Sequence, residues 1–78
     1  MPVTFEQENL LAESKALLLR LEKEKIETFS DRDMRLILAY QMWADGMVWK
    51  NVQYLLKSKD PFWDREKILD YCKNVFGL

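Results

Sequence analysis

Histidine is absent from this chain, and its 78 residues include only one cysteine and two glycines. Without histidine there is no Ser-His-Asp or Cys-His nucleophile system, and the usual histidine metal sites cannot form. Gly46 and Gly77 lie too far apart to build a P-loop or a dinucleotide-binding loop. We therefore predict a protein that is not an enzyme and that uses no metal, cofactor or small-molecule substrate.

Long apolar runs and disulfide partners are also missing. No stretch approaches the roughly 18 apolar residues of a membrane span, and the acidic start is unlike a signal peptide. The single cysteine, Cys72, excludes an internal disulfide and a cysteine zinc cluster. Because Cys72 falls on the apolar side of a predicted helix, we expect a buried, inert thiol. We expect a soluble, cytoplasmic protein without a membrane partner.

Net charge is close to zero, at −1, with a pI of about 5.4. A general nucleic-acid binder usually carries a clear basic excess, so this balance argues against that class. Hydrophobic residues make up 49% of the chain, whereas glycine and proline number two each. This composition is globular and leaves little chain for loops. The length allows one small domain, residues 1–78.

Apolar residues recur at helical spacing, and no segment alternates as a strand does. The first predicted element is a long amphipathic helix over residues 4–27. Thr4 and Gln7 form a capping-box pattern at its start. Its apolar stripe consists of Leu10, Leu11, Leu17, Leu18 and Leu21. Leu19 and Ile26 lie outside this stripe and indicate a second packing surface, such as a dimer contact.

Residues 31–76 are predicted to form a compact three-helix unit. Its first helix, 31–45, follows a Ser30 cap and ends at Gly46. The second spans 48–57. The third begins with Asp60 as N-cap and Pro61 in its first turn, and it ends at Gly77. The fold class is therefore all-α: a small four-helix domain with a long N-terminal helix and a compact three-helix C-terminal unit.

The segment around Gly46 resembles a helix-turn-helix. In that motif an apolar residue follows the glycine and two buried residues recur in the next helix, here Met47, Val52 and Leu55. The resemblance implies an outward face that could contact bases and phosphates. That face comprises Lys50, Asn51, Gln53, Tyr54 and Lys57. Three residues depart from the motif: Met42 replaces a small residue, Val48 replaces a polar cap, and Trp49 is bulky.

Aromatic residues concentrate in the second half of the chain. Eight of the ten lie from residue 40 onward: Tyr40, Trp43, Trp49, Tyr54, Phe62, Trp63, Tyr71 and Phe76. Most are expected in the core, but Trp49, Tyr54 or Trp63 would serve as an interface anchor if exposed, because Trp and Tyr dominate binding hot spots.

Two function hypotheses follow from these patterns. The first is a small regulatory or adaptor protein that binds another protein, or itself, through an aromatic-rich helical surface. The alternative is a helix-turn-helix DNA-binding transcriptional regulator, dimeric through its first helix. The predicted partner-binding residues are Trp49, Tyr54, Trp63, Lys50, Asn51 and Gln53.

Overall fold

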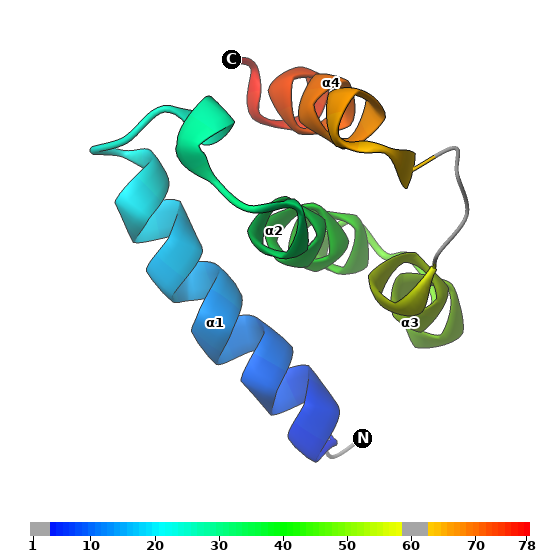
Figure 1. Ribbon diagram of the computed structural model, residues 1–78. Coiled ribbons are helices and arrows are strands. Elements are labelled where there is room, and N and C mark those ends of the chain that lie inside the picture. The colour runs from blue at the N-terminus through cyan, green and yellow to red at the C-terminus, as the bar shows by residue number, and fades with distance from the viewer. Residues whose placement is uncertain (1–3, 59–62) are drawn as a thin grey trace.

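The computed structural model describes residues 4–58 and 63–78. Within these ranges the chain forms four α-helices and no strand, which confirms the all-α fold class. The helices are α1 (Phe5–Leu21), α2 (Asp31–Ala44), α3 (Trp49–Lys57) and α4 (Arg65–Phe76). A short 3-10 helix, η1 (Ile26–Thr28), lies between α1 and α2 (Figure 1).

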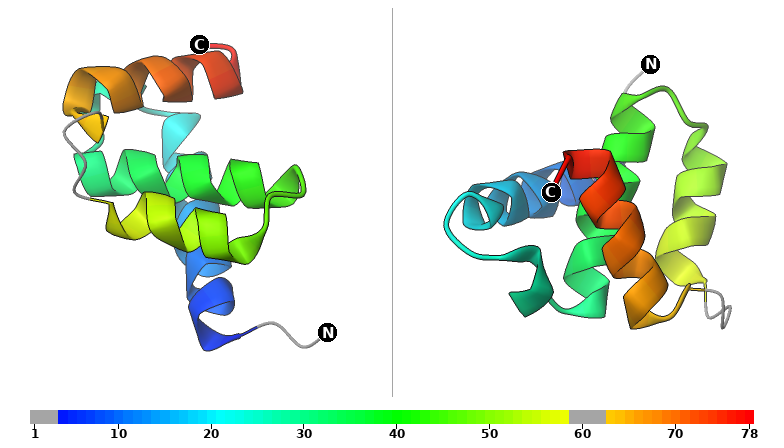
Figure 2. Two further views of the ribbon diagram at one scale, coloured as in Figure 1. Left: turned by 90° about the vertical axis from the view of Figure 1, so that its right-hand side faces the viewer. Right: turned by 90° about the horizontal axis from the view of Figure 1, so that it is seen from above.

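Helix α2 is the centre of the fold. It packs against α1, α3 and α4, which lie around it in both views of Figure 2. Four consecutive residues of α2, Leu36, Ile37, Leu38 and Ala39, are buried. Because successive residues of a helix point about 100° apart, such a run buries the helix on every side. The burial of these four residues therefore places α2 among neighbours on all sides at this level.

Helix α1 begins as predicted and ends earlier than predicted. The Thr4 side chain accepts from the Gln7 amide, and the Gln7 side chain accepts from the Thr4 amide, which completes the capping box. The predicted end at residue 27 is wrong, because α1 stops at Leu21. The turn that follows allows Ile26 and Phe29 to enter the core, where only 2% and 1% of their surfaces remain accessible.

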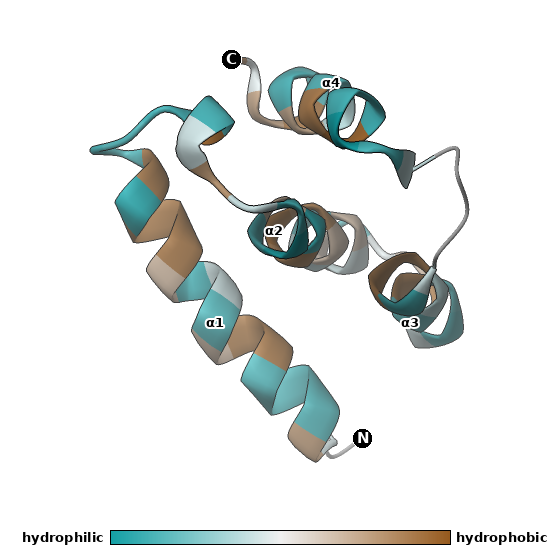
Figure 3. Ribbon diagram, viewed as in Figure 1, coloured by the Kyte–Doolittle hydropathy of each residue, from teal (hydrophilic) through white to brown (hydrophobic). Residues whose placement is uncertain are grey.

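This early end also changes the interpretation of the two off-stripe residues. Ile26 belongs to η1 and is buried, so it does not form a second surface on α1. Leu19 remains on α1 and is 63% exposed. The predicted leucine stripe faces the core, with Leu10 and Ser14 fully enclosed and Leu17 partly buried. In Figure 3, hydrophobic (brown) and hydrophilic (teal) segments alternate along α1, which is the pattern of a helix with one side facing the core and the other facing solvent.

The ends of the other helices follow their capping residues. Ser30 caps α2, and Gly46 after α2 has a φ of 100°, a conformation that glycine adopts without strain. Gly77 ends α4 with a φ of 69°. The described α4 begins at Arg65, after Asp64, whose carboxylate accepts from the Lys67 amide. The predicted start at Asp60 and Pro61 lies outside the described residues. In the described parts of the chain, every helix is too short or too polar to cross a bilayer.

Candidate functional site

Helix α3 presents a polar and aromatic surface that no described element covers. Val52 and Leu55 face the core, whereas Lys50, Asn51, Tyr54 and Lys57 are exposed. These four residues are called the α3 surface below. Lys50, Tyr54 and Lys57 follow one another at helical spacing, so they form a single row along α3. Tyr54 is 64% exposed, and α3 contains no carboxylate that could neutralise the two lysines.

Gln53 lies at the edge of this surface and contacts α1. Its side-chain amide nitrogen donates to a carboxylate oxygen of Glu6 at 2.8 Å. Gln53 is consequently half-buried and holds the start of α1 beside α3. Of the predicted partner-binding residues, Gln53 already has a partner within the chain.

Trp49 lies between the core and the surface. Its ring centroid is 5.2 Å from that of Trp43, with the ring planes tilted by 58°, and both indoles pack against the buried core. Trp49 also borders a shallow groove of about 240 Å³ that is lined by residues of α1, α2 and α3. Leu10 and Leu56 line this groove, and Lys57 joins it to the α3 surface. Trp49 therefore closes the edge of the core and remains partly accessible.

Trp63 lies apart from the α3 surface. Its ring is 5.3 Å from that of Tyr71 in α4. The six predicted residues are thus divided: Lys50, Asn51 and Tyr54 share one face, Trp49 and Gln53 lie toward α1, and Trp63 lies with α4.

Three arginines that the sequence analysis did not single out organise the connections between helices. Arg35 donates to the main-chain carbonyls of Leu55, Ser58 and Trp63, at 3.3, 2.6 and 2.8 Å respectively. These carbonyls lie at the C-terminal end of α3 and just before α4. The only sequence signal for this role is the cation itself, which interrupts the apolar run of α2.

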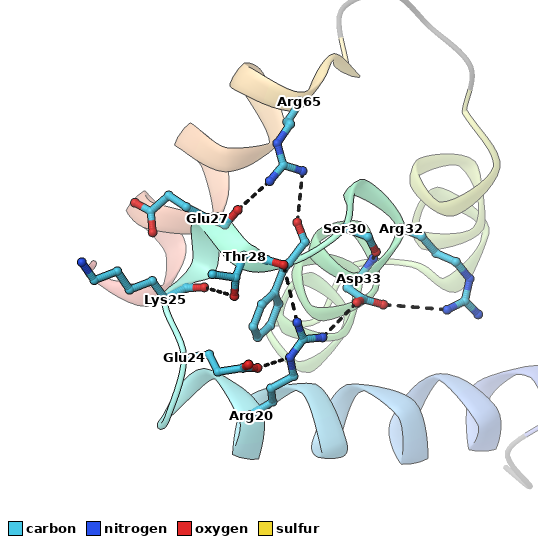
Figure 4. A network of polar contacts seen from close by, with 10 residues as sticks. Arg20, Glu24, Lys25, Glu27, Thr28, Ser30, Arg32, Asp33 and Arg65 are labelled. Carbon is cyan, nitrogen blue, oxygen red and sulfur yellow. Dashed lines mark hydrogen bonds and ion pairs between the residues drawn. The ribbon is translucent and has the colours of Figure 1, made fainter.

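Arg20 and Arg65 hold η1 and the start of α2 from opposite sides (Figure 4). Arg20 pairs with Glu24 and Asp33, and its guanidinium lies 4.4 Å from the centre of the Phe29 ring. The hydrogen bond to Glu24 raises the pKa of Arg20. The sequence places Arg20 on the polar side of α1, but the contacts it makes from there depend on the turn after Leu21.

Arg65 extends the same network from α4. It donates to the carbonyls of Glu27 and Phe29, at 2.6 and 3.0 Å, and to the Asp31 carboxylate at 2.8 Å. Nearby, Lys73 lies 2.8 Å from the Glu27 carboxylate, and this hydrogen bond lowers the pKa of Glu27. Charged groups thereby hold η1 between α1 and α4.

Cys72 is fully buried, as its place on the apolar side of α4 predicts. Its thiol donates to the carbonyl of Met34 at 3.5 Å, and burial raises its pKa to about 11. A thiol of this kind stays protonated and is a poor nucleophile. Among the described residues, no cluster of acidic or cysteine side chains could hold a metal ion.

No protein-family model matches the chain, and neither a curated protein nor a solved structure resembles it significantly.

Proposed function

We propose that this protein is a small regulatory or adaptor protein that binds an acidic surface of another protein through the α3 surface. The observation that carries the proposal is Tyr54, a 64% exposed aromatic residue between two lysines on a helix without carboxylates. Tyrosine supplies a rigid contact area with a polar tip, and it is enriched at binding hot spots.

The charges around Tyr54 indicate the chemistry of the partner. Lys50 and Lys57 have no ion pair among the described residues, so both ammonium groups are available to carboxylates. A partner surface with an apolar pocket for Tyr54 and acidic residues around it would complement this face. The accessible side of Trp49 would extend the contact into the groove beside α1. Trp63 would contribute indirectly, because Arg35 donates both to the main-chain carbonyl of Trp63 and to that of Leu55 at the end of α3.

Capture from a nuclease-treated native lysate tests this proposal. We expect wild type to retain a protein that Tyr54→Ala does not retain, because the exposed ring makes few contacts within the chain and its loss leaves the fold intact. Circular dichroism checks the fold of the variant. The proposal fails if no protein is captured, or if Tyr54→Ala captures the same proteins as wild type.

A matched pair of double variants tests the role of charge. Lys50→Glu with Lys57→Glu places the change on the α3 surface, whereas Lys23→Glu with Lys25→Glu makes the same change in net charge beyond α1. We expect only the first pair to release the partner. Equal release by both would show an effect of overall charge and would contradict a specific site.

DNA binding is the second candidate, favoured by the exposure of Lys50, Asn51 and Lys57 on the helix that follows the Gly46 turn. The test is fluorescence anisotropy with a labelled random-sequence DNA duplex. A DNA-binding protein would lose affinity steeply with added salt as phosphate contacts are lost, and Lys50→Glu with Lys57→Glu would abolish binding. Absence of binding at low salt would remove this candidate.

A further inference from the structure

The outer side of α1 carries an apolar row that the fold leaves uncovered. Phe5, Ala12, Ala16 and Leu19 are all exposed, and Phe5 and Leu19 are 76% and 63% accessible. At about 100° per residue, these residues fall on the side of α1 opposite the buried Leu10 and Ser14. Figure 1 shows α1 at the edge of the molecule, with α2, α3 and α4 all on its other side.

The spacing along this row is that of a helix-pairing surface. Phe5, Ala12 and Leu19 recur every seventh residue, which keeps one line of contact facing a neighbouring helix. Small alanines at the middle of the row would let a second helix approach closely, while the larger side chains at either end would supply apolar contact. The row thus has the shape of one half of a helix pair.

Charges along the row indicate which helix it fits. Glu8 and Lys15 flank the same edge of the row, and neither has an ion pair among the described residues. In an antiparallel pair of identical helices centred on Ala12, each flank meets the same flank of the other copy. Glu8 would then lie near Lys15 of the other copy, and Phe5 would lie opposite Leu19.

A parallel arrangement gives the opposite result. It would bring Glu8 toward Glu13 of the other copy and Lys15 toward Arg20, so both contacts would join like charges. Like charges across an interface disfavour that arrangement. On the flank of Glu8 and Lys15, the charges therefore favour the antiparallel pair. On the other flank Glu13 would lie near Glu13 of the other copy, but each Glu13 is already paired with Arg32 of its own chain.

We propose that the outer face of α1 is an antiparallel self-association surface that joins two copies of this chain. It lies on a different element from the α3 surface, so it goes beyond the proposed function and does not depend on it. A contact made by one helix of 17 residues is small, below roughly 1,200 Å² in total. We therefore expect a reversible dimer that forms at micromolar or higher concentration.

Sedimentation velocity over a range of concentrations tests the proposal with the full chain. We expect wild type to shift from monomer to dimer, and Ala12→Glu to raise the dissociation constant at least about tenfold by placing charges face to face. The matched control is Ala44→Glu, which makes the same substitution at an exposed position of α2 and should dimerise as wild type does. Circular dichroism checks that both variants are folded.

Charge-swapped variants test the orientation. Glu8→Lys and Lys15→Glu should each weaken the dimer, and the double variant should restore it. In a parallel dimer, Glu8→Lys would instead strengthen association, because the new lysine would face Glu13. The proposal is overturned if wild type stays monomeric up to about 1 mM, if Ala12→Glu still dimerises as wild type does, or if Glu8→Lys strengthens the dimer.

The two proposals have separate readouts. Ala12→Glu should still capture the partner of the α3 surface, and Tyr54→Ala should still dimerise. Failure of one proposal is therefore distinguishable from failure of the other.

Discussion

The hydroxyl of Ser14 donates a hydrogen bond to the main-chain carbonyl of Leu36, with 3.2 Å between the two oxygens. Ser14 has no accessible surface and lies where α1 meets α2. On another side of α2, the Cys72 thiol of α4 donates to the carbonyl of Met34. The central helix therefore accepts hydrogen bonds from two of its neighbours as well as packing against them.

Replacing Ser14 tests how tightly α1 packs on α2. Leucine would complete the apolar stripe of the sequence, but the space holds only a hydroxymethyl group, so we expect Ser14→Leu to lower the free energy of unfolding by about 1–3 kcal/mol. Ser14→Ala removes only the hydrogen bond and should cost about 0.5–1.5 kcal/mol. Urea denaturation measures both. Ala44→Leu, at an exposed position, is the control, and a Ser14→Leu variant as stable as wild type would contradict this packing.

Arg35 should matter more to stability than its neighbour Arg32. Arg35→Met removes the three hydrogen bonds that Arg35 donates to main-chain carbonyls, and we expect a loss of roughly 2–3 kcal/mol. Arg32 is paired with Glu13 on the surface, and its side chain is 70% exposed, so Arg32→Met should cost about 1 kcal/mol or less. Chemical denaturation compares the two. Arg35→Lys should not restore wild-type stability, because an ammonium group cannot reproduce the planar fork of guanidinium.

The Cys72 thiol should make stability fall at alkaline pH. Burial raises its pKa from 9.0 to about 11, so the folded state holds the proton more tightly than the unfolded state does. The resulting stabilisation is complete below pH 9 and is lost as the pH rises toward 11. We expect the difference in unfolding free energy between wild type and Cys72→Ala to decrease over this interval. A difference that stays constant with pH would contradict the assignment.

The same burial predicts slow alkylation. At pH 8, iodoacetamide should modify Cys72 in the folded protein only as fast as the chain opens, whereas an Ala44→Cys thiol should react at once. Rapid modification of Cys72 without unfolding would show that the thiol is accessible.

Trp43 and Trp49 should couple optically. Their ring centroids are 5.2 Å apart, close enough for an exciton signal in circular dichroism. We expect Trp43→Phe and Trp49→Phe each to remove this signal, and Trp63→Phe to retain it, since Trp63 contacts Tyr71 instead. Trp49→Ala should also destabilise the fold by about 2 kcal/mol, because the indole packs against the core. An unchanged spectrum in Trp49→Phe would contradict the pairing.

Much of the fold can be predicted from local signals in the sequence. The Thr4 capping box, the Ser30 cap and the two terminating glycines fix helix ends through contacts within a few residues, and all are present in the structure. The end of α1 could not be predicted in this way. Residues 22–25 are compatible with a helix. The chain turns there because burying the side chains of Ile26 and Phe29 in the core is more favourable than continuing the helix.

The candidate site was predictable only in part. Exposure of Lys50, Asn51 and Tyr54 follows from the helical position of Val52 and Leu55, which the sequence shows. The position of Trp49 depends on Trp43, and that of Gln53 depends on Glu6. Contacts between separate helices have no local pattern, so the sequence left the accessibility of Trp49 open. It placed Gln53 on the outward face, whereas the structure has Gln53 half-buried against α1.

The sequence by itself therefore determined the helices, their caps and their apolar sides, because these depend on backbone chemistry and on spacing along one helix. Only the tertiary structure decided that α2 lies at the centre, that Arg20, Arg35 and Arg65 hold the connections, and that the outer side of α1 stays uncovered. These features depend on which helices meet, which is set by the packing of all apolar sides together.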